Sequence, residues 1–186
     1  MNSAARHRRH DPERRDRIID ACLDVIAEHG VAGTSHRRVA AAADVPLGSM
    51  TYHFTGMDEL LREAFTRFSA TVIATIGQRM KAAETLDDMI DAVADHVQGD
   101  IFGTDRDLVL THELYTLAAR KPEYRQLTNA WMAASRAALE RHLDPNTACM
   151  LDALIEGLTI HRALDIEPQD PALVREAITR IIRTGE

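Results

Sequence analysis

TSHRRVAAAADVPLGSMTYHFTGMDELL, residues 34–61, decides the fold of this chain. The stretch predicts a short helix, a tight turn, a second short helix and the start of a third. The turn is Asp44-Val45-Pro46, in which Asp tolerates the left-handed backbone of a tight turn and Pro can stand at the start of a helix. Because this order of elements is that of a helix-turn-helix, we expect a unit that places its second helix in a groove of DNA.

The second helix of the motif, at about residues 47–53, presents small and polar groups that suit close approach to DNA better than they suit a core. The residues predicted to contact base edges or to allow close approach are Gly48, Ser49, Thr51 and His53. The residues predicted to contact phosphates are Thr34, Ser35, Arg38 and Tyr52. The alternative is a pair of short helices that pack together for stability alone.

Several segments in and around this motif resemble the DNA-binding head of the tetracycline-repressor (TetR) family. They are Ile18–Gly30, Thr34-Ser35, Val39-Ala40, Asp44-Val45, Gly48–Phe54 and Met57–Leu61. The resemblance covers about residues 13–65. Three residues depart from the family pattern: Thr51 replaces the first Tyr of a pair, Asp44 replaces the turn Gly, and Met57 replaces a Lys that often contacts a phosphate.

This resemblance implies a homodimeric transcriptional regulator, usually a repressor, that binds double-stranded DNA at a palindromic operator. It also implies a helical body in which a small molecule binds and shifts the long helix that starts near Gly56, so that the protein leaves its operator. We therefore expect a three-helix head with a basic N-terminal arm over residues 1–56. Residues 57–186 are expected to form a ligand-binding and dimerisation body.

Charge is distributed unevenly along the 186 residues, whose net charge is −7. Residues 1–56 carry eight Lys and Arg against seven Asp and Glu, whereas residues 57–186 carry 14 against 22. The head can thus present a positive surface to phosphates although the whole chain is acidic. The acidic body argues against a strongly anionic effector, so we expect one that is neutral or cationic and largely hydrophobic.

Helical periodicity extends over nearly the whole chain, and strand patterns are absent. Hydrophobic residues make up 45% and aromatic residues 4%, which with much Ala and Leu predicts an all-α protein of about nine helices. Beyond the motif, the expected helices are 12–29, 56–83, 86–98, 105–119, 122–143, 146–165 and 170–183. No run of about 18 apolar residues and no secretory signal occurs, so we expect a cytoplasmic protein without a membrane partner.

The body offers candidates for an effector cavity and for a subunit interface. The candidate cavity lining combines apolar groups with a few that can orient a ligand: Phe68, Val72, Met89, Val93, His112, Tyr115, Trp131 and His161. The last two helices carry wider apolar arcs than one core contact needs, which predicts a homodimer interface. The predicted interface residues are Leu151, Ile155, Leu158, Ile178 and Ile181. Packing inside one chain is the alternative for both sets.

Catalytic and metal-binding motifs are incomplete. His112-Glu113 resembles the start of a zinc-protease motif, but Thr116 stands where the second His is needed. Cys22 and Cys149 are isolated on apolar helix positions, which predicts buried thiols in a reducing compartment. We therefore expect no enzyme activity, no cofactor and no metal.

Two other functions stay open. The first is a helix-turn-helix regulator whose body is a protein-interaction module without a ligand. The second is an all-helical enzyme that uses His112, Glu113 and His161.

Overall fold

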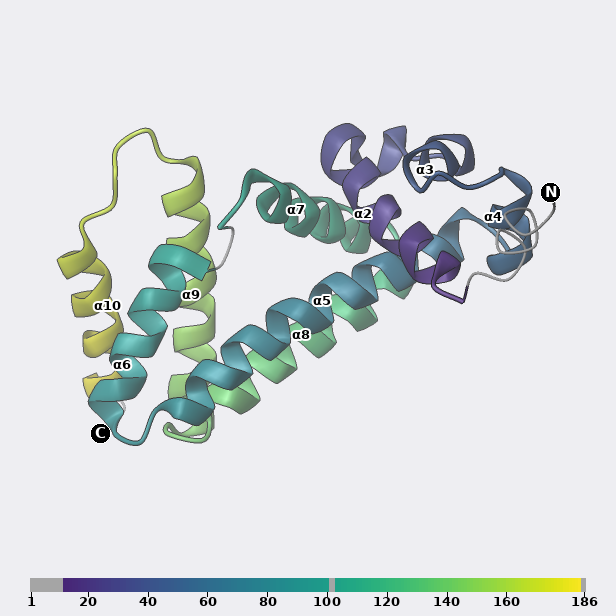
Figure 1. Ribbon diagram of the computed structural model, residues 1–186. Coiled ribbons are helices and arrows are strands. Elements are labelled where there is room, and N and C mark those ends of the chain that lie inside the picture. Colours follow the sequence, from purple (N-terminus) through teal and green to yellow (C-terminus); the bar gives the residue numbers. More distant parts are fainter. Residues whose placement is uncertain (1–11, 101–102, 185–186) are drawn as a thin grey trace, which may run out of the picture. The chain divides into compact units, whose positions relative to one another are not determined.

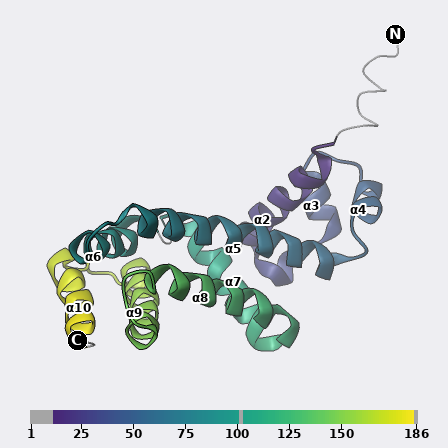
Figure 2. The same ribbon diagram turned by 90° about the horizontal axis from the view of Figure 1, so that it is seen from below.

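The computed structural model describes residues 12–100 and 103–184, and that part of the chain consists of helices and connecting turns without a strand. The all-α class predicted from the sequence is confirmed. The elements in chain order (Figures 1 and 2) are α2 (Arg14–Gly33), α3 (His36–Ala42), α4 (Gly48–His53), α5 (Met57–Ala82), α6 (Leu86–Asp95), η1 (His96–Asp100), α7 (Asp105–Arg120), η2 (Pro122–Tyr124), α8 (Arg125–Leu139), α9 (Pro145–Leu164) and α10 (Pro171–Thr184).

The chain divides into two compact units, the head at residues 1–67 and the body at residues 68–186. In the head, α2 packs against α3, and α3 packs against α4. Ile18, Val39, Met50 and Phe65 are fully buried. The predicted basic arm belongs to residues 1–11 and lies outside the described residues.

Two residues with positive φ shape the helix-turn-helix. Asp44 has a φ of 51° in the turn between α3 and α4, the left-handed conformation that the sequence predicts for it. Gly30 has a φ of 68° inside α2, so the regular helix stops where the sequence places its end, and one further turn continues to Gly33.

The division between head and body falls inside α5, between Arg67 and Phe68, later than the predicted boundary after residue 56. Leu60 and Phe65, on the first turns of α5, are fully buried in the head. Arg67 donates a hydrogen bond to the Asp20 carboxylate of α2 at 2.8 Å. The first turns of α5 therefore belong to the head, because they complete its core and pair with α2.

The core of the body lies among α6, α9 and α10, with α8 packed against α9 (Figure 1). Val93, Leu139, Leu151 and Ile178 contribute fully buried side chains from these four helices. Local signals fix the helix starts. Thr85 and Asp88 form a reciprocal capping box at α6, and the Asp144 carboxylate caps α9 directly before Pro145.

Two predicted helices are divided in the structure. The segment predicted at 86–98 is α6 followed by η1, a single π-helical turn. The segment predicted at 122–143 starts with the 3₁₀ turn η2, and α8 ends at Leu139. In the turn that follows α8, His142 donates from Nε2 to the Met80 carbonyl at 3.2 Å, so this tertiary contact holds a turn where periodicity predicts more helix.

Candidate DNA-binding face and effector pocket

The face of α4 that is predicted to meet DNA is largely exposed. Tyr52 is 84% exposed, Gly48 and Thr51 are exposed, and His53 is half-buried. Ser49 differs, because it is only 9% exposed and lies next to the fully buried Met50 on this six-residue helix. Of the two roles predicted for Ser49, its burial favours close approach of α4 over direct contact with a base edge, and that role stays a prediction.

The predicted phosphate contacts around α3 already make local hydrogen bonds. Thr34 donates from Oγ1 to the Gly30 carbonyl at 2.8 Å. Ser35 is the N-cap of α3 and accepts the backbone N–H of Arg38, whose guanidinium donates to the Gly33 carbonyl. Ser35 and Arg38 remain exposed, as phosphate binding at a helix start requires.

His53 lies against two cationic residues of the head. Burial lowers the pKa of His53, and repulsion by Arg14 and Arg15 lowers it further. The ring of His53 also meets the Tyr52 ring edge-on, with 4.9 Å between centroids. The imidazole is therefore held neutral near pH 7, a form that can both donate and accept a hydrogen bond.

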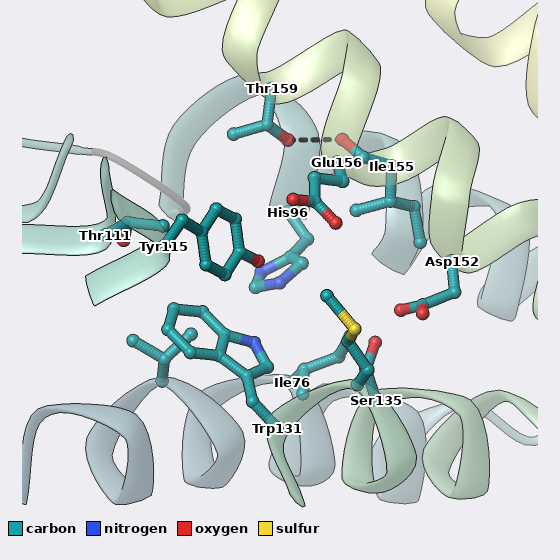
Figure 3. Close-up of a pocket in the computed structure, with 12 residues that line it drawn as sticks. Ile76, His96, Thr111, Tyr115, Trp131, Ser135, Asp152, Ile155, Glu156 and Thr159 are labelled. Carbon is teal, nitrogen blue, oxygen red and sulfur yellow. Dashed lines mark hydrogen bonds between the residues drawn. The ribbon is translucent and has the colours of Figure 1, made fainter. Parts of the chain in front are cut away.

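A pocket opens inside the body between α5, η1, α7, α8 and α9 (Figure 3). About 520 Å³ of space not filled by protein atoms lies in it, and this volume includes open solvent. Its lining residues are Val72, Ile76, His96, Thr111, Tyr115, Trp131, Met132, Ser135, Asp152, Ile155, Glu156 and Thr159. The lining combines aromatic and aliphatic groups with a few polar ones, which is the usual composition of a small-molecule site.

Aromatic rings form one wall of this pocket. Trp131 of α8 lies with its ring centroid 6.3 Å from that of Tyr115 on α7. Phe68 of α5 meets Trp131 edge-on from outside the lining, at 5.9 Å. These spacings are those of favourable aromatic pairs, so the Trp131 indole is held in place as a flat apolar surface.

Two carboxylates from α9 also line the pocket, as Figure 3 shows. Asp152 and Glu156 are four residues apart, so they lie on the same face of the helix, and both are half-buried. The Tyr115 hydroxyl donates a hydrogen bond to Glu156. Burial raises the pKa of Tyr115, and the charge of Glu156 raises it further. The phenol therefore stays protonated and remains a hydrogen-bond donor.

Asp152 has a different environment. Burial raises the pKa of Asp152, while a hydrogen bond from Ser135 and the charge of Arg136 act in the opposite direction. Arg136 thus offsets part of the Asp152 charge. Glu156, by contrast, accepts a hydrogen bond from a neutral group, the Tyr115 hydroxyl.

Only some of the residues predicted to line an effector cavity line this pocket. Val72, Tyr115 and Trp131 line it, and Phe68 supports it from behind. The other four residues lie elsewhere. Met89 and Val93 are fully buried in the core cluster, His112 is half-buried and donates from Nδ1 to the Leu108 carbonyl, and His161 is exposed. The prediction that these four residues line this pocket is therefore wrong, because the helix faces that carry them do not face it.

Sequence reasoning missed the polar part of the lining, above all Asp152 and Glu156. A signal was present, since both carboxylates interrupt the apolar arc of α9 at positions four residues apart. Ile155, which the sequence assigns to a subunit interface, lies between them and lines the pocket. Two acids within an apolar helix face are unfavourable unless they meet a partner, and that cost marks them as candidate binding groups.

The predicted interface residues fall into two groups. Leu151, Ile155 and Ile178 are at most 4% exposed and pack inside the single chain, so they cannot offer surface to a second copy. Leu158 and Ile181 are partly buried against the same core and retain some surface. Leu158 and Ile181 therefore stay as predicted interface residues, and the other three are corrected to core residues.

The two cysteines also differ. Cys22 is fully buried in α2, as predicted, whereas Cys149 is exposed at the start of α9, so the prediction of a buried thiol is wrong there. His112, Glu113 and His161 do not meet in the pocket. Among residues 12–100 and 103–184 no helix is long and apolar enough to cross a membrane.

Comparison with known proteins adds two family matches. The model described as "Bacterial regulatory proteins, tetR family" matches residues 18–64, and "Tetracyclin repressor-like, C-terminal domain" matches residues 82–184. The second match alone spans more than half of the chain. Together they cover the head with its helix-turn-helix and nearly all of the body.

Solved structures and a curated relative agree with these matches. SCO7518 of Streptomyces coelicolor A3(2), described as a candidate transcriptional regulator, is 58% identical, with a TM-score of 0.87 over 92% of this chain and 99% of that one. The multidrug binding protein EbrR, solved with imidazole, is 35% identical, with a TM-score of 0.74 over 92% and 96%. EbrR has also been solved with proflavin, ethidium and malachite green.

The curated relative is the nicotine-responsive transcriptional repressor HdnoR of Paenarthrobacter nicotinovorans. It is 22% identical over 171 residues, which are 86% of this chain and 87% of HdnoR. The helix-turn-helix head, the helical body with its pocket and these matches lead to one conclusion. The chain belongs to the tetracycline-repressor (TetR) family of bacterial transcriptional regulators, which joins a DNA-binding head to a ligand-responsive body.

Proposed function

We propose that this protein is a homodimeric repressor that leaves a palindromic operator in the cytoplasm when a flat, hydrophobic aromatic cation binds in the body pocket. The observation that carries the proposal is Glu156, a half-buried carboxylate in the lining of a pocket that also presents the Trp131 indole. A carboxylate supplies a counter-ion, and an indole face attracts a cation further. A neutral hydrophobic ligand would leave Glu156 without a charge partner.

The relatives support the same class of effector. Proflavin, ethidium and malachite green, with which EbrR has been solved, are all aromatic cations. HdnoR responds to nicotine, a pyridine that carries a basic tertiary amine. Met132 adds a flexible side chain to the lining, which lets the site adapt to rings of different size.

The route from pocket to DNA runs through α5. Val72 and Ile76 of this helix line the pocket, and its first turns belong to the head. A ligand that fits one position of α5 better than another biases the protein toward a state with lower operator affinity. The alternative of a body that only binds a protein partner is less well supported, because such a body needs no acid-lined aromatic pocket.

The dimer is proposed to form through α9 and α10. Met150 is 48% exposed on α9, Leu164 is 61% exposed on the same helix, and Leu173 is 61% exposed on α10. Together with the partly buried Leu158 and Ile181, they leave apolar surface in water that a second copy can cover. Two heads then reach two half-sites of a palindrome.

Trp131 is the only Trp of the chain, so its fluorescence reports directly on the pocket. The test titrates the full-length protein with N-methylacridinium, a permanent cation, and with acridine, its neutral parent in mildly alkaline buffer. We expect the cation to bind at least about tenfold more tightly, and Glu156→Gln to remove most of that preference. Glu140→Gln, which changes an exposed carboxylate after α8, is the matched control and should have no effect.

Equal binding of the two ligands by the wild-type protein would overturn the proposed effector class. The same protein is also used to select DNA from a random pool. Failure to retain any sequence above background would overturn the regulator itself.

A further inference from the structure

The two carboxylates of the pocket have different partners, and this difference points to a more specific ligand. Glu156 is bonded by the neutral Tyr115 hydroxyl, whereas Asp152 is bonded by Ser135 and lies in the field of Arg136. Glu156 alone would supply the single counter-ion that a monovalent cation requires. Asp152 is therefore an additional half-buried acceptor that the proposed function has not yet used.

The acceptor capacity of Asp152 is not exhausted by the contacts that it makes. A carboxylate offers about four lone-pair sites on two oxygens. Ser135 donates to one of them, and Arg136 acts through its charge. Because Asp152 lies in the pocket wall, as Figure 3 shows, the remaining capacity is available to a bound molecule.

The spacing of the two acids sets a geometry. Residues four apart on a helix are separated by about 6 Å along its axis, from a rise of about 1.5 Å per residue. Asp152 and Glu156 therefore form a ladder of two acceptors along one side of the pocket. The Trp131 indole, which lines the same pocket, offers a flat apolar surface to the rest of the ligand.

A third polar group supports a ligand that makes hydrogen bonds. Thr111 of α7 lines the same pocket and is only 1% exposed. Its Oγ1 is buried and has no hydrogen-bond partner within the part of the chain that the structure describes. A buried hydroxyl without a partner is unfavourable, and this one adjoins the space that a ligand would fill.

We infer that the pocket selects aromatic cations that also carry an amino group, with Glu156 as the counter-ion of the cationic centre and Asp152 as the acceptor of an amino N–H. This inference rests on the proposed function and makes it more specific. Arg136 offsets part of the Asp152 charge. Asp152 therefore favours ligands that carry a hydrogen-bond donor, and it depends less on the charge of the ligand. Rings of the same size and charge but without an N–H leave Asp152 without its second donor.

The test compares two permanent cations of the same ring system, N-methylacridinium, which has no N–H, and its diamino derivative. Quenching of Trp131, corrected for ligand absorbance, gives both dissociation constants for the full-length protein. We expect the diamino compound to bind the wild type about tenfold or more tightly than its parent, as a hydrogen bond to a charged acceptor implies.

Two variants assign the gain to its residue. Asp152→Ala removes the acceptor and should reduce the gain to near unity, while Asp152→Asn, which keeps the volume and one weaker acceptor, should retain part of it. Glu156→Gln should weaken both ligands by a similar factor and leave the gain intact. The variants and the two ligands form a cycle in which general differences between the ligands cancel.

The outcomes separate the inference from the function on which it rests. Equal affinities of the two compounds for the wild type, or a gain that persists undiminished in Asp152→Ala, would overturn the inference alone. Absence of binding by either compound, or no effect of Glu156→Gln on either, would overturn the proposed cation site as well. Circular dichroism and thermal unfolding of each variant identify any that fail to fold, in which case Asp152→Asn decides.

Discussion

Replacement of Tyr115 by Phe is expected to tighten the binding of an aromatic cation. The Tyr115 hydroxyl donates to Glu156 in the empty pocket. In Tyr115→Phe, the half-buried Glu156 carboxylate loses this hydrogen bond, which destabilises the unliganded protein. A bound cation supplies a new partner, so the substitution destabilises the empty state more than the occupied one.

The magnitude follows from the kind of bond and its exposure. A hydrogen bond to an ionised group contributes about 1.5–3 kcal/mol when it is well buried. Tyr115 and Glu156 are both half-buried, so solvent replaces part of that contribution, and we expect a loss of about 1 kcal/mol in unfolding free energy. If most of this loss is recovered on binding, the affinity for the cation rises about three- to fivefold.

The assay has two readouts. Urea unfolding of Tyr115→Phe gives the stability change, and Trp131 quenching by N-methylacridinium gives the dissociation constant. Neutral acridine is the control ligand, because it offers Glu156 no charge and should bind the variant and the wild type alike. A lower or unchanged affinity of Tyr115→Phe for the cation would refute the reasoning, since it would mean that the hydroxyl contacts the ligand or bonds Glu156 equally in both states.

Three further predictions concern the head, the interface and the thiols. Tyr52→Ala should weaken operator binding by at least about tenfold without changing urea unfolding, because Tyr52 is 84% exposed in the free protein; normal affinity in gel-shift assays would exclude the predicted phosphate contact. Ile181→Arg should convert the dimer to monomers in sedimentation experiments, whereas the control Arg180→Ala should remain dimeric. If Ile181→Arg also sediments as a dimer, the interface lies elsewhere. A thiol reagent should label Cys149 in the native protein and both cysteines after unfolding, because burial raises the pKa of Cys22 to about 12; rapid native labelling of Cys22 would contradict its burial.

The elements of the fold could be predicted because their signals are local. Asp144-Pro145 marks the start of α9, Thr85 and Asp88 cap α6, and Asp44 accepts the left-handed turn of the helix-turn-helix. Each of these residues acts on the backbone within a few positions of itself. Local sequence therefore predicts such helix boundaries well.

The pocket could be predicted only in part, because it depends on which helix faces meet. Met89 and Val93 have the apolar side chains of a ligand site, yet α6 turns them into the core shared with α9 and α10. Asp152 and Glu156 look like solvated charges in the sequence, but the packing of α7 and α8 against this part of the body makes them a pocket wall. Tertiary packing decides this, and periodicity along one helix does not record it.

Release from the operator is the measurement that tests the central claim most directly. Flat cations also intercalate in DNA, so wild type and Glu156→Gln are compared on the same operator fragment over the same range of N-methylacridinium concentration. We predict that the wild type dissociates as Trp131 becomes quenched, and that Glu156→Gln needs about tenfold more ligand for both effects. Release at the same ligand concentration from both proteins would contradict the account, because it would show that the ligand acts on the DNA or on a site other than the pocket.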